Sequence, residues 1–266
     1  MKFLKLTIIF AVLLTCASMY AQTSKTRLWS KADGKGSNHA ELWRFAPDIA
    51  QNGNSKAVII CPGGSYHHLG LKNEGVKAAR WFCSKGYDAY VLRYRVAMNG
   101  FHHPAMLEDF ERAVEMVNAD SIGAIGFSAG GHLVLMAGAF LPKGKRPAWV
   151  AAIYPVVSMQ DSIAHPWSRK SLLGRHYTQE AKDKFSMELQ IPDDMPPVYL
   201  QVSDDDHTVN PQNSIALSKV LEQKGVTYTF SHFNNGGHGY GFGNNSFNST
   251  SHWYDTLYQW LQTVCK

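Results

Sequence analysis

The sequence predicts an α/β fold in which a mostly parallel, doubly wound sheet carries helices on both faces. Short continuous apolar runs, typical of strands buried on both faces, alternate with amphipathic segments of helical period along the chain. A Gly-x-Ser-x-Gly sequence (Gly126, Ser128, Gly130) stands where one such run meets a helical segment. The length of 266 residues suits one large α/β unit, with no internal repeat or linker. We therefore predict a single domain over residues 22–266.

Each element follows from its local pattern. Two short strands at residues 27–30 and 41–46 flank a glycine-rich turn at 33–36, so we expect an antiparallel edge. The other strands are predicted at residues 56–61, 88–93, 121–127, 149–157, 197–203 and 226–232. The helices are predicted at residues 74–85, 105–118, 133–140, 213–224 and 252–265. Asp109 and Arg112 are expected to form an i, i+3 ion pair of structural importance.

A segment without clean periodicity, residues 159–191, separates two of the predicted strands. It is rich in His, Ser, Arg and Lys and contains one short helical piece at residues 169–173. An insertion at this point would lie over the carboxyl ends of the strands as a short cap. Two roles stay open for its polar and aromatic side chains, namely contact with a substrate or a solvated surface. They are His165, Trp167, Arg169, His176 and Tyr177.

The N-terminus has the pattern of a secretory signal peptide over residues 1–21. Two early lysines precede an apolar run at residues 6–14, and Ala21 ends a small-residue cleavage site. The protein is therefore expected to be secreted or periplasmic, and lipid attachment at Cys16 is the weaker alternative because Thr15 suits it poorly. The apolar run is too short for a membrane span, and no other segment is apolar enough.

Charge and cysteine content exclude several classes of function. The formal net charge of +5 is spread along the chain without a basic run, which argues against a nucleic-acid partner. After signal removal three cysteines remain, Cys61, Cys83 and Cys265, so they cannot all pair within the chain. Cys61 and Cys83 read as buried small hydrophobes. No Cys/His spacing suits a metal ion, so no metal site is predicted.

Ser128 is the candidate nucleophile. Gly126 and Gly130 flank it because a serine on a sharp strand-to-helix turn needs small neighbours, and the turn lifts its hydroxyl clear of the sheet. The same turn directs the Ala129 N–H, at the positive end of the next helix, toward a developing oxyanion.

A second oxyanion donor is expected from the loop after the strand at residues 56–61. Glycines directly past a strand leave backbone N–H groups free to approach a ligand closely. We assign the donor to Gly64, while the amides of Gly63 and Ser65 stay open. The alternative is that this loop is a plain turn.

The candidate acid lies in a run of three carboxylates directly after the strand at residues 197–203. Asp206 is preferred because Asp-x-x-Val, with Val209, is the usual form of this loop in serine enzymes of this type; Asp205 is the second choice. Asp204 is expected to cap or solvate the turn.

The candidate base is His238, one of 12 histidines. It alone is late in the chain and lies among glycines, which let the backbone carry its ring over the nucleophile. His67, His68 and His132 are expected to pack or support the site, and His207 to be exposed. The order serine, acid, histidine is that of the α/β-hydrolases.

Five motifs together resemble the secreted bacterial acetyl-xylan-esterase-like branch of the α/β-hydrolase superfamily, over residues 41–261. The resemblance implies an α/β-hydrolase fold, a carbohydrate esterase that removes acetyl groups from plant polysaccharides such as xylan, and no metal or organic cofactor. Ser65 departs from the family, where a third glycine is common, and so does Asn210, where proline is common. The motifs are residues 61–66, 92–95, 126–132, 205–209 with Asn213 and Ser214, and 236–239.

The expected activity is hydrolysis of acetyl esters on carbohydrates by a Ser-His-Asp triad through an acyl-enzyme. A feruloyl or other short-chain carboxylesterase and a non-catalytic binding protein on the same fold are the alternatives. A peptidase of this fold usually carries a large extra domain, and a lipase would be expected to show a more apolar cap. The sequence gives no indication of the oligomeric state.

Overall fold

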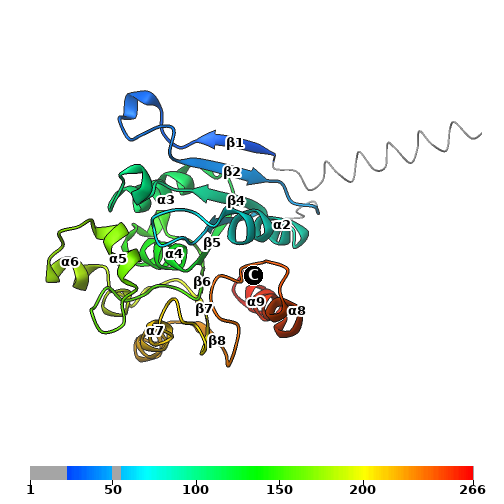
Figure 1. Cartoon of the computed structure of the whole chain (residues 1–266). Coiled ribbons are helices and arrows are strands. Elements are labelled where there is room, and N and C mark those ends of the chain that lie inside the picture. Colours follow the sequence, from blue (N-terminus) through cyan, green and yellow to red (C-terminus); the bar gives the residue numbers. More distant parts are fainter. Residues whose placement is uncertain (1–22, 50–54, 266) are drawn as a thin grey trace, which may run out of the picture.

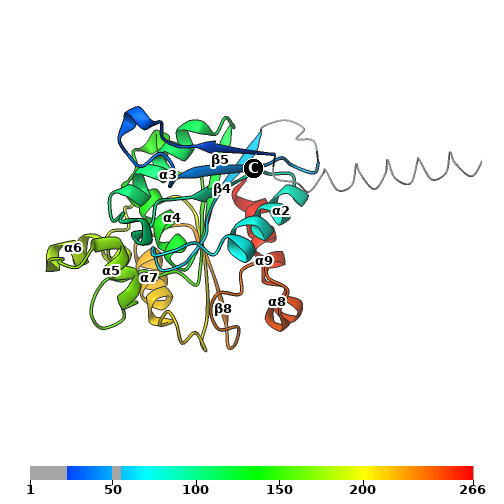
Figure 2. The ribbon, with the colours of Figure 1, turned by 45° about the horizontal axis from the view of Figure 1, so that its top comes forward.

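The computed structural model describes residues 23–49 and 55–265. Within these residues an eight-stranded sheet runs through the molecule from β1 to β8, and helices cover both of its faces (Figures 1 and 2). The signal peptide predicted at residues 1–21, with Cys16 inside it, lies outside the described residues. No helix in the described part of the chain is long and apolar enough to cross a bilayer.

The strand order in the sheet is β1-β2-β4-β3-β5-β6-β7-β8. β1 and β2 pair antiparallel at one edge, as predicted, and β3 to β8 are parallel. The carboxyl ends of the parallel strands therefore share one side of the sheet, and the loops that follow them can meet there. The bounds are β1 Ser24–Arg27, β2 Glu41–Phe45, β3 Lys56–Cys61, β4 Asp88–Arg93, β5 Ser121–Phe127, β6 Val150–Ile153, β7 Val198–Ser203 and β8 Tyr228–Phe233.

Two hydrophobic cores lie on the two faces of this sheet. Successive side chains of a strand point to opposite faces, so Ile59 joins one core and Ile60 the other. The first core holds α3, α4 and α7, and the second holds α2 and α9; Figure 2 shows these two sets on opposite sides of the strands. The helices are α2 Lys77–Ser84, α3 Ala105–Met116, α4 Ala129–Phe140, α5 Pro166–Leu173, α6 Gln179–Lys184, α7 Gln212–Gln223, α8 Ser246–Ser251 and α9 Trp253–Val264.

Helix α4 is buried on every side, from Ala129 to Ala139. Its sequence is apolar all round, which suits a helix enclosed by protein. The sheet and α3 cover part of it, and the cap segment covers another part through Phe185 and Met187, which belong to the same core.

Several local predictions differ from the structure. The first strand ends at Arg27, because the Ser30 N–H and hydroxyl bond the Asp33 carboxylate and start a helical turn instead. The strand predicted at 149–157 stops at Ile153, since Tyr154 has a φ of 38° and does not continue an extended strand.

Before α2, the segment Leu71–Val76 forms a π-helical turn, whereas an ordinary helix was predicted to begin at residue 74. The predicted Asp109–Arg112 pair does not form. Asp109 instead receives hydrogen bonds from the backbone N–H and the guanidinium of Arg95, and Arg112 pairs with Glu115. Asp109 lies on the inner face of α3, so its partner comes from the strand-end loop rather than from its own helix.

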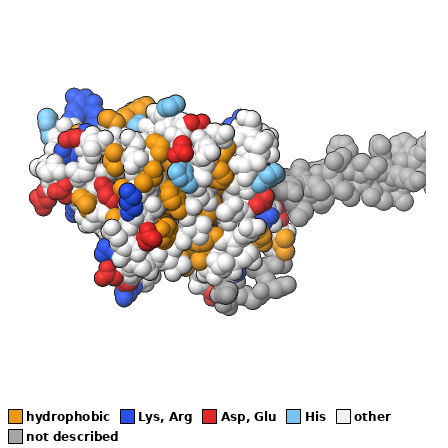
Figure 3. Space-filling model, turned by 90° about the horizontal axis from the view of Figure 1, so that it is seen from below, with side chains coloured by type: hydrophobic (Ala, Val, Ile, Leu, Met, Phe, Trp, Pro, Cys, Tyr) orange, Lys and Arg blue, Asp and Glu red, His pale blue; other side chains and the backbone are white. Residues whose placement is uncertain are grey.

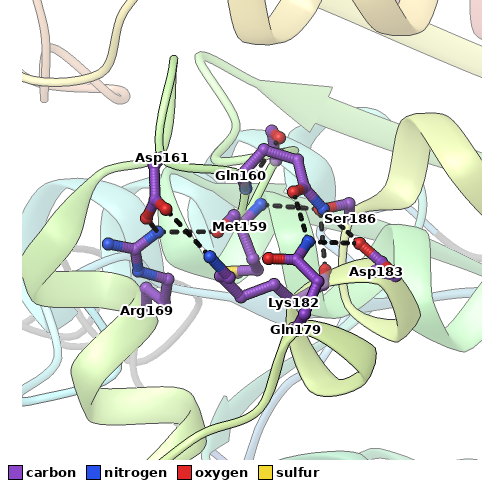
Figure 4. Close-up of polar contacts among 9 residues, drawn as sticks. Met159, Gln160, Asp161, Arg169, Gln179, Lys182, Asp183 and Ser186 are labelled. Atoms are coloured by element: carbon purple, nitrogen blue, oxygen red, sulfur yellow. Dashed lines mark hydrogen bonds and ion pairs between the residues drawn. The ribbon is translucent and has the colours of Figure 1, made fainter.

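The cap segment holds α5, α6 and a short 3₁₀ turn at Met187–Leu189. Helix α5 starts earlier than predicted because the His165 ring caps it by accepting from the Ser168 N–H, with Pro166 in the first turn. Figure 4 shows the polar network that joins the two cap helices. In it, the Asp161 carboxylate bonds Arg169 of α5 at 2.5 Å and Lys182 of α6 at 2.9 Å.

The surface carries both signs of charge. Viewed from the side on which β8 lies, hydrophobic side chains gather in a band across the middle of the face, and charged groups of both signs are scattered around it (Figure 3). Cys61 and Cys83 are buried and Cys265 is half-buried, and all three are free thiols.

Candidate active site

The turn between β5 and α4 holds Ser128 in a strained backbone conformation, with φ 52° and ψ −119°. Its two flanking glycines are required by contact. A Cβ on Gly126 would overlap the carbonyl oxygen of Gly130, and a Cβ on Gly130 would overlap that of Cys61. Because the strained turn is enclosed this tightly, the Ser128 hydroxyl has a fixed position at the carboxyl end of the sheet.

The structure brings Ser128, His238 and Asp206 together. The His238 Nε2 atom lies 2.9 Å from Ser128 Oγ, and its Nδ1 atom lies 2.7 Å from Asp206 Oδ2. An ionised carboxylate only accepts hydrogen bonds, so Nδ1–H donates to Asp206 and Nε2 is left to accept the Ser128 proton. The second oxygen of Asp206 accepts from the backbone N–H groups of Thr208 and Val209, each at 2.9 Å.

The other two carboxylates of the run point elsewhere. Asp205 is exposed and accepts a hydrogen bond from the Gly237 N–H at 2.7 Å, next to His238. Asp204 lies 2.6 Å from His232 Nε2. The geometry thus puts Asp206 at the imidazole and uses Asp205 to anchor the loop that carries it.

The loop after β3 supplies amides near Ser128. The Gly63 N–H donates to Glu74 Oε2 at 2.8 Å, so it is occupied and cannot serve an oxyanion. Among the described residues nothing accepts from the N–H groups of Gly64 and Ser65, which are partly exposed. Ser65 has a φ of 57°, a left-handed conformation that glycine adopts without strain. This agrees with the glycine that is common at this position in the family that the motifs resemble. The assignment of Gly64 with Ala129 as the oxyanion donors stays a prediction.

A cavity of about 610 Å³ opens over these groups. Ser128 and His238 line it together with Gly64, Ser65, His68 and Thr208. The lining combines apolar surface with polar side chains and includes several glycines, as expected of a cleft in which a few polar groups orient the ligand. No group of three or more His, Cys, Asp or Glu side chains in the described residues could hold a metal ion.

Two buried residues were missed by the sequence reasoning, namely Glu74, which lines the cavity, and Tyr154, which contacts Glu74. Glu74 is only 7% exposed, and its Oε1 atom accepts from the Tyr154 hydroxyl at 2.7 Å. The same hydroxyl oxygen accepts from the Gly241 N–H at 2.9 Å, and the Tyr154 ring lies 4.7 Å from the His238 ring.

The Glu74 carboxylate therefore connects the oxyanion loop, through Gly63, with the loop that carries His238, through Tyr154 and Gly241. Burial raises the pKa of Glu74, while the hydrogen bonds from Tyr154 and Gly63 oppose that rise. A signal was available in the sequence: Glu74 precedes Ala78 and Phe82 by steps of four, so it lies on the apolar face of its helix.

The remaining candidate histidines take the supporting positions that were expected. His132 is fully buried, and its ring nitrogens contact the Tyr66 hydroxyl and the Phe185 carbonyl, each at 2.8 Å. Burial lowers the pKa of His132 to about 4. His67 and His68 lie against Trp167 of the cap, with ring centroids 5.1 and 6.0 Å away.

A serine on a strand-to-helix turn of a parallel sheet, with an aspartate and a histidine from two later strand-end loops, defines the serine hydrolases of the α/β-hydrolase fold. The chain belongs to the prolyl oligopeptidase family, whose model matches residues 105–266. A second family model, BD-FAE, matches residues 45–145.

Two curated relatives are similar over most of this chain. An acetylxylan esterase from Xylanibacter ruminicola is 28% identical over 246 residues, which are 87% of this chain and 49% of that protein. An endo-1,4-beta-xylanase B from Butyrivibrio fibrisolvens is 29% identical over 254 residues, 85% of this chain and 39% of that protein. The chain thus spans half or less of the length of these relatives.

Solved structures share the fold. An acetyl ester-xyloside bifunctional hydrolase from Caldicellulosiruptor lactoaceticus matches with a TM-score of 0.80 and 26% identity, over 91% of this chain and 97% of that one. An esterase from Thermogutta terrifontis, 17% identical, matches with a TM-score of 0.74 over 92% and 93% of the two chains and shows the fold alone. The predicted α/β-hydrolase fold and the resemblance to acetyl-xylan-esterase-like hydrolases are confirmed.

Proposed function

We propose that this protein is a serine carboxylesterase that removes acetyl groups from carbohydrates such as acetylated xylan. The observation that carries the proposal is the hydrogen-bonded series Asp206–His238–Ser128, whose serine and histidine line an open cavity. Similarity to an acetylxylan esterase and to an acetyl ester-xyloside hydrolase supports the choice of substrate.

The reaction proceeds in two acyl-transfer steps. His238 Nε2 takes the hydroxyl proton of Ser128 as Ser128 Oγ attacks the ester carbonyl carbon, and Asp206 stabilises the resulting imidazolium. Amides of Ala129 and of the loop at Gly64 donate to the oxyanion. The imidazolium then protonates the departing sugar oxygen, and the acetyl group stays on Ser128. Water, deprotonated by His238, releases acetate and restores the serine.

The location proposed for the enzyme is outside the cytoplasm. Residues 1–21 carry the pattern of a cleaved signal peptide, and a polysaccharide substrate would be met there. N-terminal sequencing of the mature protein from its native host tests this proposal. A first residue of Gln22 supports it, whereas a lipid-modified Cys16 would replace cleavage after Ala21 with lipoprotein anchoring.

Acetate release from acetylated xylan by the purified mature chain tests the function. Acetyl, butyryl and feruloyl model esters and a prolyl peptide are assayed beside it. We expect fast release from xylan and acetyl esters, and loss of activity in the folded Ser128→Ala variant to below about 10⁻³ of wild type. Ser162→Ala, which alters an exposed cap serine, is the matched control.

Each other outcome has a defined meaning. Activity confined to model acetyl esters would refute the polysaccharide substrate but keep the serine mechanism. Preference for the feruloyl ester would favour a feruloyl esterase, and preference for the peptide would favour the activity after which the family is named. Undiminished activity in Ser128→Ala would remove Ser128 from the mechanism.

A further inference from the structure

A second cavity, of about 350 Å³, lies beside the one that holds Ser128. It forms between the loop after β4 and helix α5, and His67 and Trp167 line it. His68, the neighbour of His67, lines the cavity of Ser128 instead. The two histidine rings are 6.0 Å apart, and the Trp167 ring lies against both of them. The two cavities are therefore separated by a thin wall of aromatic rings.

Trp167 is unusual for a surface residue of this size, with 49% of its area exposed. One side of its ring is supported by the two histidines, and the rest is open to solvent beside the cavity. The C–H faces of a pyranose ring are apolar, so such a half-supported indole can bury them by stacking while the sugar hydroxyls stay hydrated.

Two cationic side chains belong to the remaining lining. Lys170 and Arg175 border this cavity, both are exposed, and neither forms an ion pair or side-chain hydrogen bond within the described residues. His67 and His102 add imidazole groups to the same wall. Two unpaired cations beside an exposed indole suit a ligand with a sugar ring and a carboxylate.

The helix that carries Trp167 is held firmly in place. Arg169, two residues along α5, bonds both the Met159 carbonyl and Asp161, and Asp161 also bonds Lys182 of α6 (Figure 4). The Arg169 and Lys182 side chains are largely buried. A fixed aromatic ring loses little conformational freedom when a ligand stacks on it.

We infer that this cavity is a subsite for an acidic sugar, a uronic-acid unit of the same oligosaccharide whose acetyl group is presented to Ser128. The inference rests on the proposed carbohydrate substrate and adds to it a preference for chains that carry carboxylates. Trp167 stacks on the sugar ring, and Lys170 with Arg175 bind the carboxylate.

Binding of oligosaccharides without acetyl groups tests the subsite independently of catalysis, because they cannot be hydrolysed by deacetylation. Calorimetry compares a xylo-oligosaccharide that bears one glucuronic acid branch with the unbranched chain of equal length. We expect the acidic ligand to bind wild type about 3- to 30-fold more tightly, with the preference shrinking from about 10 mM to about 500 mM salt.

Variants separate the two contributions. Lys170→Ala/Arg175→Ala is expected to abolish the preference, while Lys31→Ala/Lys219→Ala, which removes the same charge elsewhere, preserves it. Trp167→Ala should weaken both ligands about tenfold, whereas Leu189→Ala, which removes another exposed apolar side chain of the cap, should not.

Equal binding of the two ligands by wild type, no binding of either, or a preference that survives the Lys170/Arg175 double variant would overturn the subsite. These outcomes differ from failure of the proposed function, which shows as absent acetate release and leaves the binding experiment readable.

Discussion

Replacement of Glu74 by glutamine tests whether the buried carboxylate holds the catalytic loops in place. The carboxylate accepts two hydrogen bonds, from the Gly63 N–H at 2.8 Å and from the Tyr154 hydroxyl at 2.7 Å. A glutamine of the same shape has one oxygen and one NH₂ group, so it can accept from only one of the two. If the NH₂ faces Gly63, two donors oppose each other. If it faces Tyr154, the tyrosine proton loses its acceptor, because an amide NH₂ group only donates.

One buried donor is thus left unsatisfied, at a cost of about 1–3 kcal/mol. If the oxyanion loop shifts so that this donor finds another partner, the loop stabilises the transition state less well. The value of kcat then falls about tenfold for each 1.4 kcal/mol of transition-state stabilisation that is lost. We therefore expect Glu74→Gln to lower kcat for 4-nitrophenyl acetate about 10- to 100-fold, with KM changed much less.

The assay combines steady-state kinetics with urea unfolding, so that a loss of stability is distinguished from a displacement of the catalytic loops in a folded enzyme. Tyr154→Phe, which removes the hydroxyl but leaves the Gly63 contact, should lower kcat less, and Glu180→Gln on the exposed start of α6 should change nothing. Wild-type kcat together with wild-type stability in Glu74→Gln would refute the reasoning.

Three further perturbations have defined outcomes. Asp206→Asn should reduce kcat by about 10³- to 10⁴-fold, because the imidazole loses its orienting acceptor, and Asp205→Asn by about tenfold or less; equal losses in ester-hydrolysis assays would contradict the assignment. Gly126→Ala should destabilise the fold by about 3 kcal/mol in urea titrations through overlap with backbone, while Gly144→Ala, where a Cβ meets open space, should be neutral. The pKa of His132 is lowered to about 4, below the value of about 6.5 in an unfolded chain. The unfolded state then binds the extra proton, so stability present above about pH 6.5 should fall by up to about 3 kcal/mol toward pH 4. Unfolding of His132→Gln, followed over the same pH range, should lack that component.

The sequence predicted best those parts whose burial is uniform. β3 and β5 are covered on both faces, so their apolar runs begin and end where the strands do. The bounds predicted for β6 were wrong, because its apolar run continues past the point where the backbone of Tyr154 turns. Helix α8 was not predicted, since its sequence of Ser, Asn, Thr and one Phe has no apolar period.

The site was predictable where one motif constrains one backbone turn, as at Ser128 and at the glycine-flanked His238. The choice between Asp205 and Asp206 depends on which way each side chain leaves the turn after β7, and no periodicity applies to a turn. Glu74 and Tyr154 were missed for another reason. The two residues bond each other across 80 positions of the chain, and each residue alone reads as part of an ordinary helix or strand.

The burial of α4 limits how this enzyme can diversify. In many scaffolds a loop over the active site is interchangeable, and a new specificity can arise by exchanging the whole module. Here the cap segment also encloses α4, the helix that follows Ser128. Phe185 of the cap packs in the same core as α4, and its carbonyl accepts a hydrogen bond from the His132 Nε2–H. Removing it would expose an apolar helix and a buried histidine. Adaptation to other substrates is therefore directed to single outward-facing side chains, while the backbone of the insertion is retained.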